Sequence, residues 1–118
     1  MTNKQIREWY RHEVSLIPEL DKKWVSDGAS LQERAQRAWK IRHDARLRAR
    51  SMMENPDEVE MLRERDRQLY GDPDGPGFEQ LVAEGQAQGF DAEEIFLRII
   101  EGSHRTNPDV DNRFHKDL

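Results

Sequence analysis

The segment from Ile41 to Arg50, IRHDARLRAR, carries four arginines and one histidine within ten residues. Guanidinium groups form strong, often bidentate hydrogen bonds with phosphate and carboxylate oxygens. An imidazole takes up or releases a proton near neutral pH, which suits it to general acid–base catalysis. The segment is therefore a candidate site for binding an anion and for acid–base chemistry on it; the alternative is that it forms only the solvated face of a helix.

Helical periodicity divides this segment into two groups of side chains. At about 100° per residue, a narrow apolar stripe forms from Leu31, Ala35, Ala38, Ala45, Ala49, Met52 and Met53. Arg42 falls inside this stripe and Arg46 lies on its edge. Trp39, His43 and Arg50 fan away from it, whereas Lys40, Asp44 and Arg48 point to the opposite side.

A second helix, expected over 56–70, carries an acid where an apolar residue is expected. Its apolar face gathers Val59, Leu62, Leu69 and Tyr70, with Asp66 among them and Arg63 beside it. Burying an ion costs several kcal/mol unless a partner and hydrogen bonds offset the loss of hydration. We therefore expect Asp66 to form a bidentate pair with Arg42 or Arg46 across the interface between the two helices.

A lone buried pair of this kind is more often a structural device that fixes helix register than a functional site. Crowding brings the functional and the structural interpretation level here, because the cluster holds more cations than one carboxylate neutralises, and the excess suits an anionic ligand. The candidate catalytic residues are His43, Arg46, Asp66 and His104, and the candidate ligand-binding residues are Arg42, Arg50, Arg63, Tyr70 and Arg105. In an enzyme, His43 or His104 would act as general acid or base, the arginines would stabilise negative charge, and Asp66 would orient one of them.

His104 and Arg105 belong to SHRTN, a segment after a predicted helix end, where loop capping is the structural alternative. Asp72 and Asp74 offer oxygen ligands but lack the spacing of a calcium loop, so we interpret them as turn residues. The sequence contains no zinc, Walker, dinucleotide-binding or nucleophile-elbow motif. It therefore predicts no metal site and no cofactor.

The elements that must position these residues are predicted to be helices. Thr2 with Gln5 and Ser30 with Glu33 form capping boxes, and Asn55 precedes a proline at a first helical position. We expect an all-α, single-domain bundle of about five to six helices with a long central helix. Its parts are N-terminal helices over 1–28, a central helical pair over 30–54 and 56–70, a Gly/Pro loop over 71–77, C-terminal helices over 78–102, and a terminal turn and tail over 107–118.

Composition narrows the classes of function. The chain has 118 residues, enough for one modest core, and its 19 Lys and Arg against 24 Asp and Glu argue against a protein that coats nucleic acid through bulk charge. It has no cysteine, which excludes thiol catalysis and a disulfide scaffold. No stretch has the length and apolar character of a membrane span or a signal peptide. The expected location is the cytoplasm, with signal-independent export still open and no membrane partner.

Three segments resemble a family of small helical bacterial domains that occur alone or behind PAAR-type spike proteins of contact-dependent (type VI) secretion systems. They are ERAQRAWKIRHDARLRARSMM, VEMLRERDRQLYGDPDGPGFEQLV and IIEGSHRTNPDVDNRF. The similarity covers Ser30 to Phe114 and implies antibacterial effector cargo, with a secretion spike or a cognate immunity protein as partner; it carries over no reaction. The sequence departs from the family pattern at Gly77, where a threonine is expected, and this weakens a helix cap.

These observations lead to a hypothesis and two alternatives. The hypothesis is a bacterial effector-type domain whose Arg/His/Asp cluster binds a phosphate-bearing or other anionic ligand. One alternative is a non-catalytic interaction module, such as an adaptor, a chaperone-like partner or an immunity protein. The other is an oligomerising helical protein that associates through Trp9 and Tyr10. Whether the chain is an enzyme, and its oligomeric state, stay open at this point.

Overall fold

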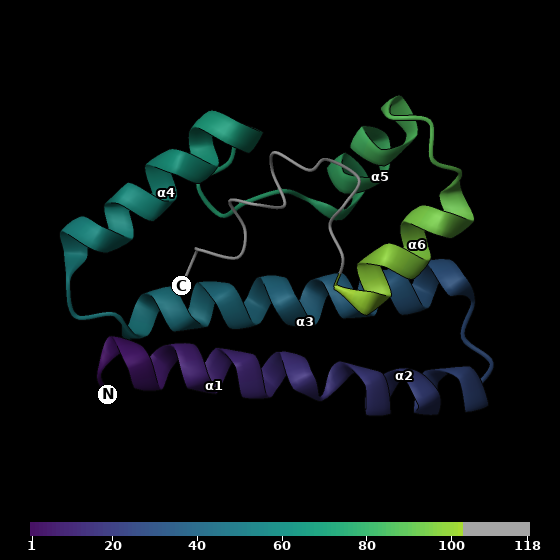
Figure 1. The fold of residues 1–118 in the computed structure, drawn as a ribbon, viewed down its shortest axis with the longest axis horizontal. Coiled ribbons are helices and arrows are strands. Elements are labelled where there is room, and N and C mark those ends of the chain that lie inside the picture. Colours follow the sequence, from purple (N-terminus) through teal and green to yellow (C-terminus); the bar gives the residue numbers. More distant parts are fainter. Residues whose placement is uncertain (103–118) are drawn as a thin grey trace.

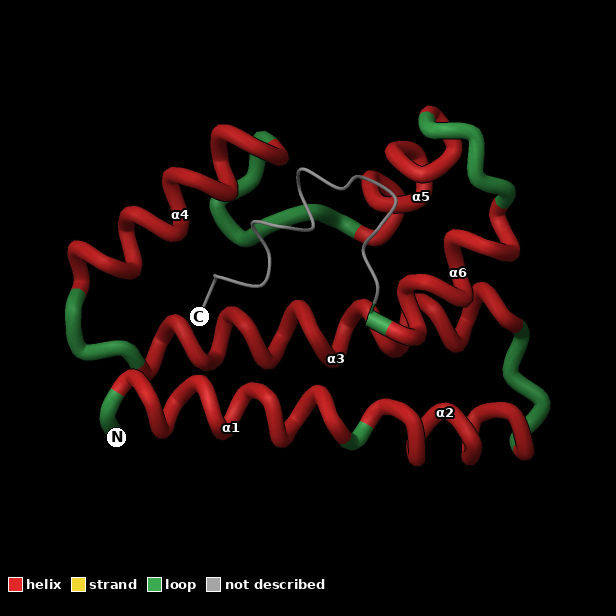
Figure 2. The backbone as a smooth tube through the Cα atoms, viewed as in Figure 1, coloured by secondary structure: helices red, strands yellow, loops and turns green. Residues whose placement is uncertain are grey.

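The computed structural model describes residues 1–102, which form helices and their connections (Figures 1 and 2). The six helices are α1 (Asn3–Ser15), α2 (Ile17–Ser26), α3 (Leu31–Met52), α4 (Pro56–Tyr70), α5 (Phe78–Ala87) and α6 (Ala92–Glu101). The expected all-α bundle with a long central helix is confirmed for this part of the chain. The terminal turn and tail predicted over 107–118 lie outside the described residues.

Side-chain caps begin several of these helices where the sequence predicts them. The Thr2 hydroxyl accepts a hydrogen bond from the Gln5 amide, and the Gln5 side chain accepts one from the Thr2 amide. The Asn55 side chain accepts from two amides in the first turn of α4. At α5 the preceding residue is Gly77, which supplies no such bond. The weak cap predicted there is confirmed.

α1 and α2 lie end to end along one side of α3 (Figure 1). Pro18 lies in the first turn of α2, where its missing amide hydrogen removes no helical hydrogen bond. α6 packs on another face of α3 and contacts α5 and α2. The main core between these helices consists of Ile17, Ala35, Ala38, Phe78, Leu81, Ile95, Ile99 and Ile100. The alanines of α3 allow the neighbouring helices to approach it closely.

α4 turns back above α3 but diverges from it along its length (Figure 1). Its apolar residues Val59 and Leu62 pack on a second, smaller cluster formed by Ile6, Ala49 and Met53. Glu58 accepts a hydrogen bond from Asn3 at 3.0 Å. Since the apolar contact is limited, ionic and polar contacts take a large part in attaching this helix.

The Gly/Pro loop over 71–77 connects α4 to α5 (Figure 2). Three side chains of α3 donate to its carbonyls: Arg50 to Pro73 at 3.2 Å, Arg46 to Asp74 at 2.9 Å and Trp39 to Pro76 at 3.1 Å. The loop therefore runs antiparallel to α3. Buried backbone carbonyls that have no partner in a helix or sheet need other hydrogen-bond donors. Side chains of α3 provide these donors for the carbonyls of the loop.

Asp72 is a turn residue, as predicted, because its carboxylate accepts a hydrogen bond from the amide of Asp74 at 2.8 Å.

Within residues 1–102, no helix combines the length and the apolar character needed to cross a membrane.

Candidate functional site

The predicted buried ion pair exists, but its cation is Arg50. The Arg50 guanidinium donates to the Asp66 carboxylate at 2.6 Å, and the two side chains are 4% and 2% exposed. Arg65 adds a second contact to this carboxylate at 3.2 Å. The expectation that Asp66 pairs with Arg42 or Arg46 is wrong. Because α4 leaves α3 at an angle, the 71–77 loop lies against α3 at Arg46, where α4 was expected.

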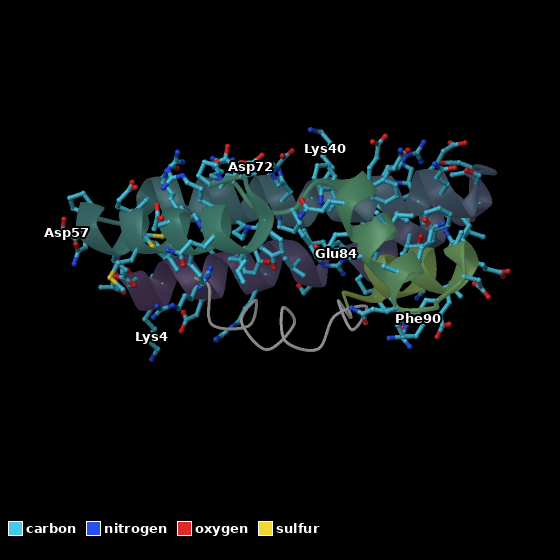
Figure 3. The ribbon with its side chains drawn as sticks, turned by 90° about the horizontal axis from the view of Figure 1, so that it is seen from above. Lys4, Lys40, Asp57, Asp72, Glu84 and Phe90 are labelled. Atoms are coloured by element: carbon cyan, nitrogen blue, oxygen red, sulfur yellow. The ribbon has the colours of Figure 1, made fainter. Side chains whose placement is uncertain are left out.

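The predicted position of Arg50 is also wrong in one respect. The helical wheel directs Arg50 away from the apolar stripe, yet this residue is only 4% exposed. A wheel drawn for one helix identifies the face that meets a single neighbour. Here α3 is covered on one face by α1 and on another by α6, and the loop covers a further sector. Lys40, Asp44 and Arg48 are exposed as predicted, and Figure 3 shows Lys40 projecting from the body.

Arg46 fixes the middle of the loop. It is 5% exposed and donates to the Asp74 carbonyl at 2.9 Å. The guanidinium lies directly on the backbone of Gly75, where a Cβ atom would come within 2.1 Å of an Arg46 nitrogen. Arg63 of α4 joins the same loop from the other side, through an ion pair with the Asp74 carboxylate at 3.2 Å.

Arg42 holds the carboxyl-terminal end of α6. Its guanidinium donates to the carbonyls of Ile99 and Ile100, in the second case at 2.9 Å. The last carbonyls of a helix lack helical partners and carry the negative end of its dipole, so a cation is favourable there. Burial lowers the pKa of Arg42 below its ordinary value, but a guanidinium remains charged at neutral pH.

A small pocket opens beside these arginines, and we call it the Trp39 pocket. Its polar lining comes from Tyr10 of α1 and from Arg42, His43 and Arg46 of α3. Its walls are Trp39, Pro76 and Leu81. The empty volume is about 310 Å³, including the part open to solvent. Because this figure includes space open to solvent, the enclosed part is smaller than a typical small-molecule site.

His43 is held in this pocket by two neighbours. Its ring stacks on Trp39 with the centroids 4.8 Å apart and the planes at 25°. Its Nδ1 lies 3.3 Å from a carboxylate oxygen of Asp44. Partial burial of Asp44 opposes its ionisation, but hydrogen bonds from His43 and Lys40 outweigh that effect and lower the pKa of this carboxyl. The carboxylate thus orients the imidazole from outside the pocket.

The structure divides the predicted site into two places. Arg42, His43 and Arg46 line the Trp39 pocket. Arg50 and Asp66 form the separate buried pair. The predicted convergence on one junction is found in part. Four of the predicted side chains meet around Pro73 and Asp74 of the loop, whereas Arg42 holds the end of α6. These four are Arg46, Arg50, Arg63 and Asp66.

The remaining predicted site residues lie elsewhere. Arg63 binds the loop, and the carbonyl of Tyr70 accepts a hydrogen bond from Gln80 at 3.4 Å. His104 and Arg105 lie outside the described residues. In the part of the chain that the structure describes, no cluster of three or more His, Asp or Glu side chains is placed to bind a metal ion.

Several residues of the Trp39 pocket and of the buried Arg50–Asp66 pair were not predicted to belong to a site. Tyr10 and Trp39 stood out only as aromatic residues on helix faces, with no signal that joined them to the arginines. Pro76 and Leu81 reach the pocket through the path of the loop, which local sequence does not determine. Arg65 had a signal, since it is adjacent to Asp66 in the sequence.

No protein-family model, no curated protein and no solved structure matches this chain. The resemblance to PAAR-associated domains therefore stays a prediction that rests on the three quoted segments.

Proposed function

We propose that this chain is a bacterial effector-type domain that binds a phosphate-bearing ligand in the Trp39 pocket. The secretion part of this proposal, with a spike or an immunity protein as partner, comes from the sequence resemblance. The ligand part comes from the chemistry of the pocket lining.

The observation that carries the ligand part is the composition of this lining. Two guanidinium groups, one imidazole and one phenol line the pocket, and none of the residues of 1–102 that line it carries a carboxylate. In a protein with a formal net charge of −5 this is a local excess of positive charge. Guanidinium groups form strong hydrogen bonds with phosphate and carboxylate oxygens, so this lining suits an anionic ligand.

His43 is the lining residue best placed to act on a bound ligand. Its stacking on Trp39 and its contact with Asp44 fix the ring, and an imidazole can accept or release a proton. If the domain is an enzyme, His43 is its general acid or base, and Arg42 and Arg46 stabilise negative charge that develops on the ligand.

Expression inside a bacterium tests this function. Wild-type chain is expected to arrest growth, and His43→Gln is expected to abolish the arrest while leaving the melting temperature within about 2 °C. His12→Gln is the matched control, because His12 is exposed on α1 and does not line the pocket. Growth arrest that persists in the His43 variant, or no arrest by the wild-type chain, contradicts the proposal.

One feature favours the alternative of a non-catalytic interaction module. Met61 on the outer side of α4 is 72% exposed and has exposed acidic residues nearby in the helix, among them Asp57, Glu60 and Glu64. Arg67 pairs with Glu60 and Glu64 on this surface, so its charges are largely balanced, and the exposed methionine is the feature that suits a protein partner. Under this alternative, expression of the chain leaves growth unchanged and protects the cell from a toxin encoded beside it.

A further inference from the structure

We infer that the 71–77 loop is a movable wall of the Trp39 pocket, and that the buried Arg50–Asp66 pair couples the release of this wall to the attachment of α4. The inference concerns how the pocket opens, so it goes beyond the proposed function and does not depend on the ligand named there. Three observations carry it. The loop forms one wall of the pocket, it lies outside the main core, and one guanidinium joins it to α4.

The loop closes one side of the Trp39 pocket. Pro76 lines the pocket and is fully buried, and its carbonyl accepts a hydrogen bond from the Trp39 indole at 3.1 Å. When Pro76 leaves Trp39, this wall is lost and the indole N–H meets water. The enclosed part of the pocket is small, because the empty volume includes space open to solvent. A ligand larger than this enclosed part therefore enters only when the loop moves.

The loop can leave α3 without breaking the main core. It has no helical or sheet structure, and side chains of α3 hold its carbonyls (Figure 2). Arg46 donates to Asp74 at 2.9 Å and Arg50 to Pro73 at 3.2 Å. The buried residues of the main apolar core come instead from α2, α3, α5 and α6. Opening of the loop therefore costs less free energy than global unfolding, in which this core is also lost.

One guanidinium links the loop to α4. Nη1 of Arg50 donates to the Pro73 carbonyl, and Nη2 of the same group donates to the Asp66 carboxylate at 2.6 Å. Because a guanidinium is planar and rigid, both bonds depend on one side-chain conformation. Arg63 of α4 adds a second link, through its ion pair with the Asp74 carboxylate at 3.2 Å. Displacement of α4 at Asp66 therefore loosens the loop beside the pocket wall.

Native-state hydrogen exchange on the full chain tests the opening. The indole N–H of Trp39 reports on the wall, because it donates to the Pro76 carbonyl, and the amide of Ile99 reports on the main core. Urea is added at concentrations below the unfolding transition. We expect the indole exchange rate to change little, because a local opening exposes little surface, and the Ile99 rate to rise steeply. An equal urea dependence of the two rates shows that the wall opens only when the protein unfolds, and this overturns the inference.

Two matched variants of α4 test the coupling. Arg63→Gln removes the ion pair with Asp74 of the loop, whereas Arg67→Gln removes ion pairs within α4 itself. The two arginine side chains are similarly exposed, at 39% and 43%, so both variants should fold. At urea concentrations where the indole rate is independent of urea, Arg63→Gln should raise the exchange rate of the Trp39 indole about threefold. Arg67→Gln should leave this rate unchanged. Equal rates in the two variants overturn the link through Arg63.

Asp66→Asn tests the buried pair directly. It keeps the shape of the side chain and removes its charge, and we expect the indole to exchange about tenfold faster or more under the same conditions. Glu58→Gln is the matched control, because Glu58 attaches the other end of α4 through Asn3 and Arg7. It should leave the indole rate unchanged.

Each outcome decides the coupling. An indole rate that does not change in Asp66→Asn overturns the role of the buried pair, and so does an equal increase in Asp66→Asn and Glu58→Gln. If Asp66→Asn does not fold, the comparison of Arg63→Gln with Arg67→Gln decides. None of these results bears on growth arrest by the wild-type chain, so the proposed function is tested separately.

Discussion

Arg50 and Asp66 join the central helix to α4 through a hydrogen bond of 2.6 Å that is almost completely closed to solvent. The same guanidinium donates to the Pro73 carbonyl, so one side chain connects α3, α4 and the loop between α4 and α5. α4 has few apolar contacts with the rest of the protein, which makes this ionic junction its principal attachment besides the small cluster at Ile6.

Removing one partner of this pair should destabilise the protein strongly. Asp66→Ala leaves the Arg50 charge buried without its carboxylate, and we expect the free energy of unfolding in urea to fall by about 3–5 kcal/mol. The double variant Arg50→Met with Asp66→Leu should be more stable than Asp66→Ala alone, because neither charge of this pair is then buried without its partner. The Lys22–Glu19 pair serves as control, since its side chains are 75% and 77% exposed. Lys22→Ala should lower the free energy of unfolding by about 1 kcal/mol or less. Equal losses for Asp66→Ala and Lys22→Ala would contradict the conclusion that the Arg50–Asp66 pair holds α4.

The fold was largely predictable because its signals are local. Helix caps depend on residues three apart, as at Thr2 and Gln5, and glycine stops such as Gly71 depend on a single residue. The burial of an acid at Asp66 was predictable in the same way, from the apolar residues around it on one helix. Such features need no knowledge of how the helices are arranged.

The partner of Asp66 depends on an angle that local sequence does not contain. α4 could have folded back along α3 and brought Asp66 to Arg42. Instead, the 71–77 loop occupies this sector of α3 at Arg46, and it forms part of the Trp39 pocket by bringing Pro76 to Trp39. The role of the arginines as donors to backbone carbonyls was missed for the same reason, since the sequence does not show which carbonyls lose their helical partners.

Gly75 should tolerate no side chain. Its φ of +95° disfavours other residues, and a Cβ atom would lie 2.1 Å from Arg46. Gly75→Ala should therefore lower the free energy of unfolding by about 2–4 kcal/mol, from backbone strain and the steric clash together. Gly89→Ala is the matched control, because Gly89 has a similar φ of +93° and no atom within 4 Å of the added Cβ. Gly89→Ala should lower the free energy of unfolding by about 1–2 kcal/mol, from backbone strain alone. Similar losses at the two glycines would show that Arg46 does not press on the loop.

Arg42 should stabilise the last turn of α6. In Arg42→Met the carbonyls of Ile99 and Ile100 lose a charged donor, so we expect a loss of about 2 kcal/mol in unfolding free energy. Amide hydrogen exchange should become faster in the last turn of α6 and stay unchanged in α1. Arg42→Lys keeps the charge but not the planar fork of donors, so its loss should be intermediate. Unchanged exchange in α6 would mean that this helix end does not depend on Arg42.

Glu84 should make the stability of the fold depend on pH in a defined direction. Burial raises the pKa of this carboxyl, the hydrogen bond from Gln80 opposes the rise only in part, and its Oε2 is buried with no hydrogen-bond partner in the described residues. Figure 3 places Glu84 within the outline of the helices, unlike Lys40 at the edge. Since the folded state then holds this proton more tightly than the unfolded state, ionisation of Glu84 opposes folding. The penalty is absent below the ordinary pKa of a glutamate and grows as pH rises through the raised value.

Glu84→Gln removes this penalty. The variant and the wild-type chain should have similar urea midpoints near about pH 4, and the variant should be the more stable near about pH 7. The gain should be modest, because much of the side chain still contacts solvent. Glu54→Gln is the control, since Glu54 is exposed and lies outside the helices, and it should follow the wild-type curve at each pH. A Glu84 variant that is less stable near neutral pH would show that the carboxylate has a stabilising partner in solution besides Gln80.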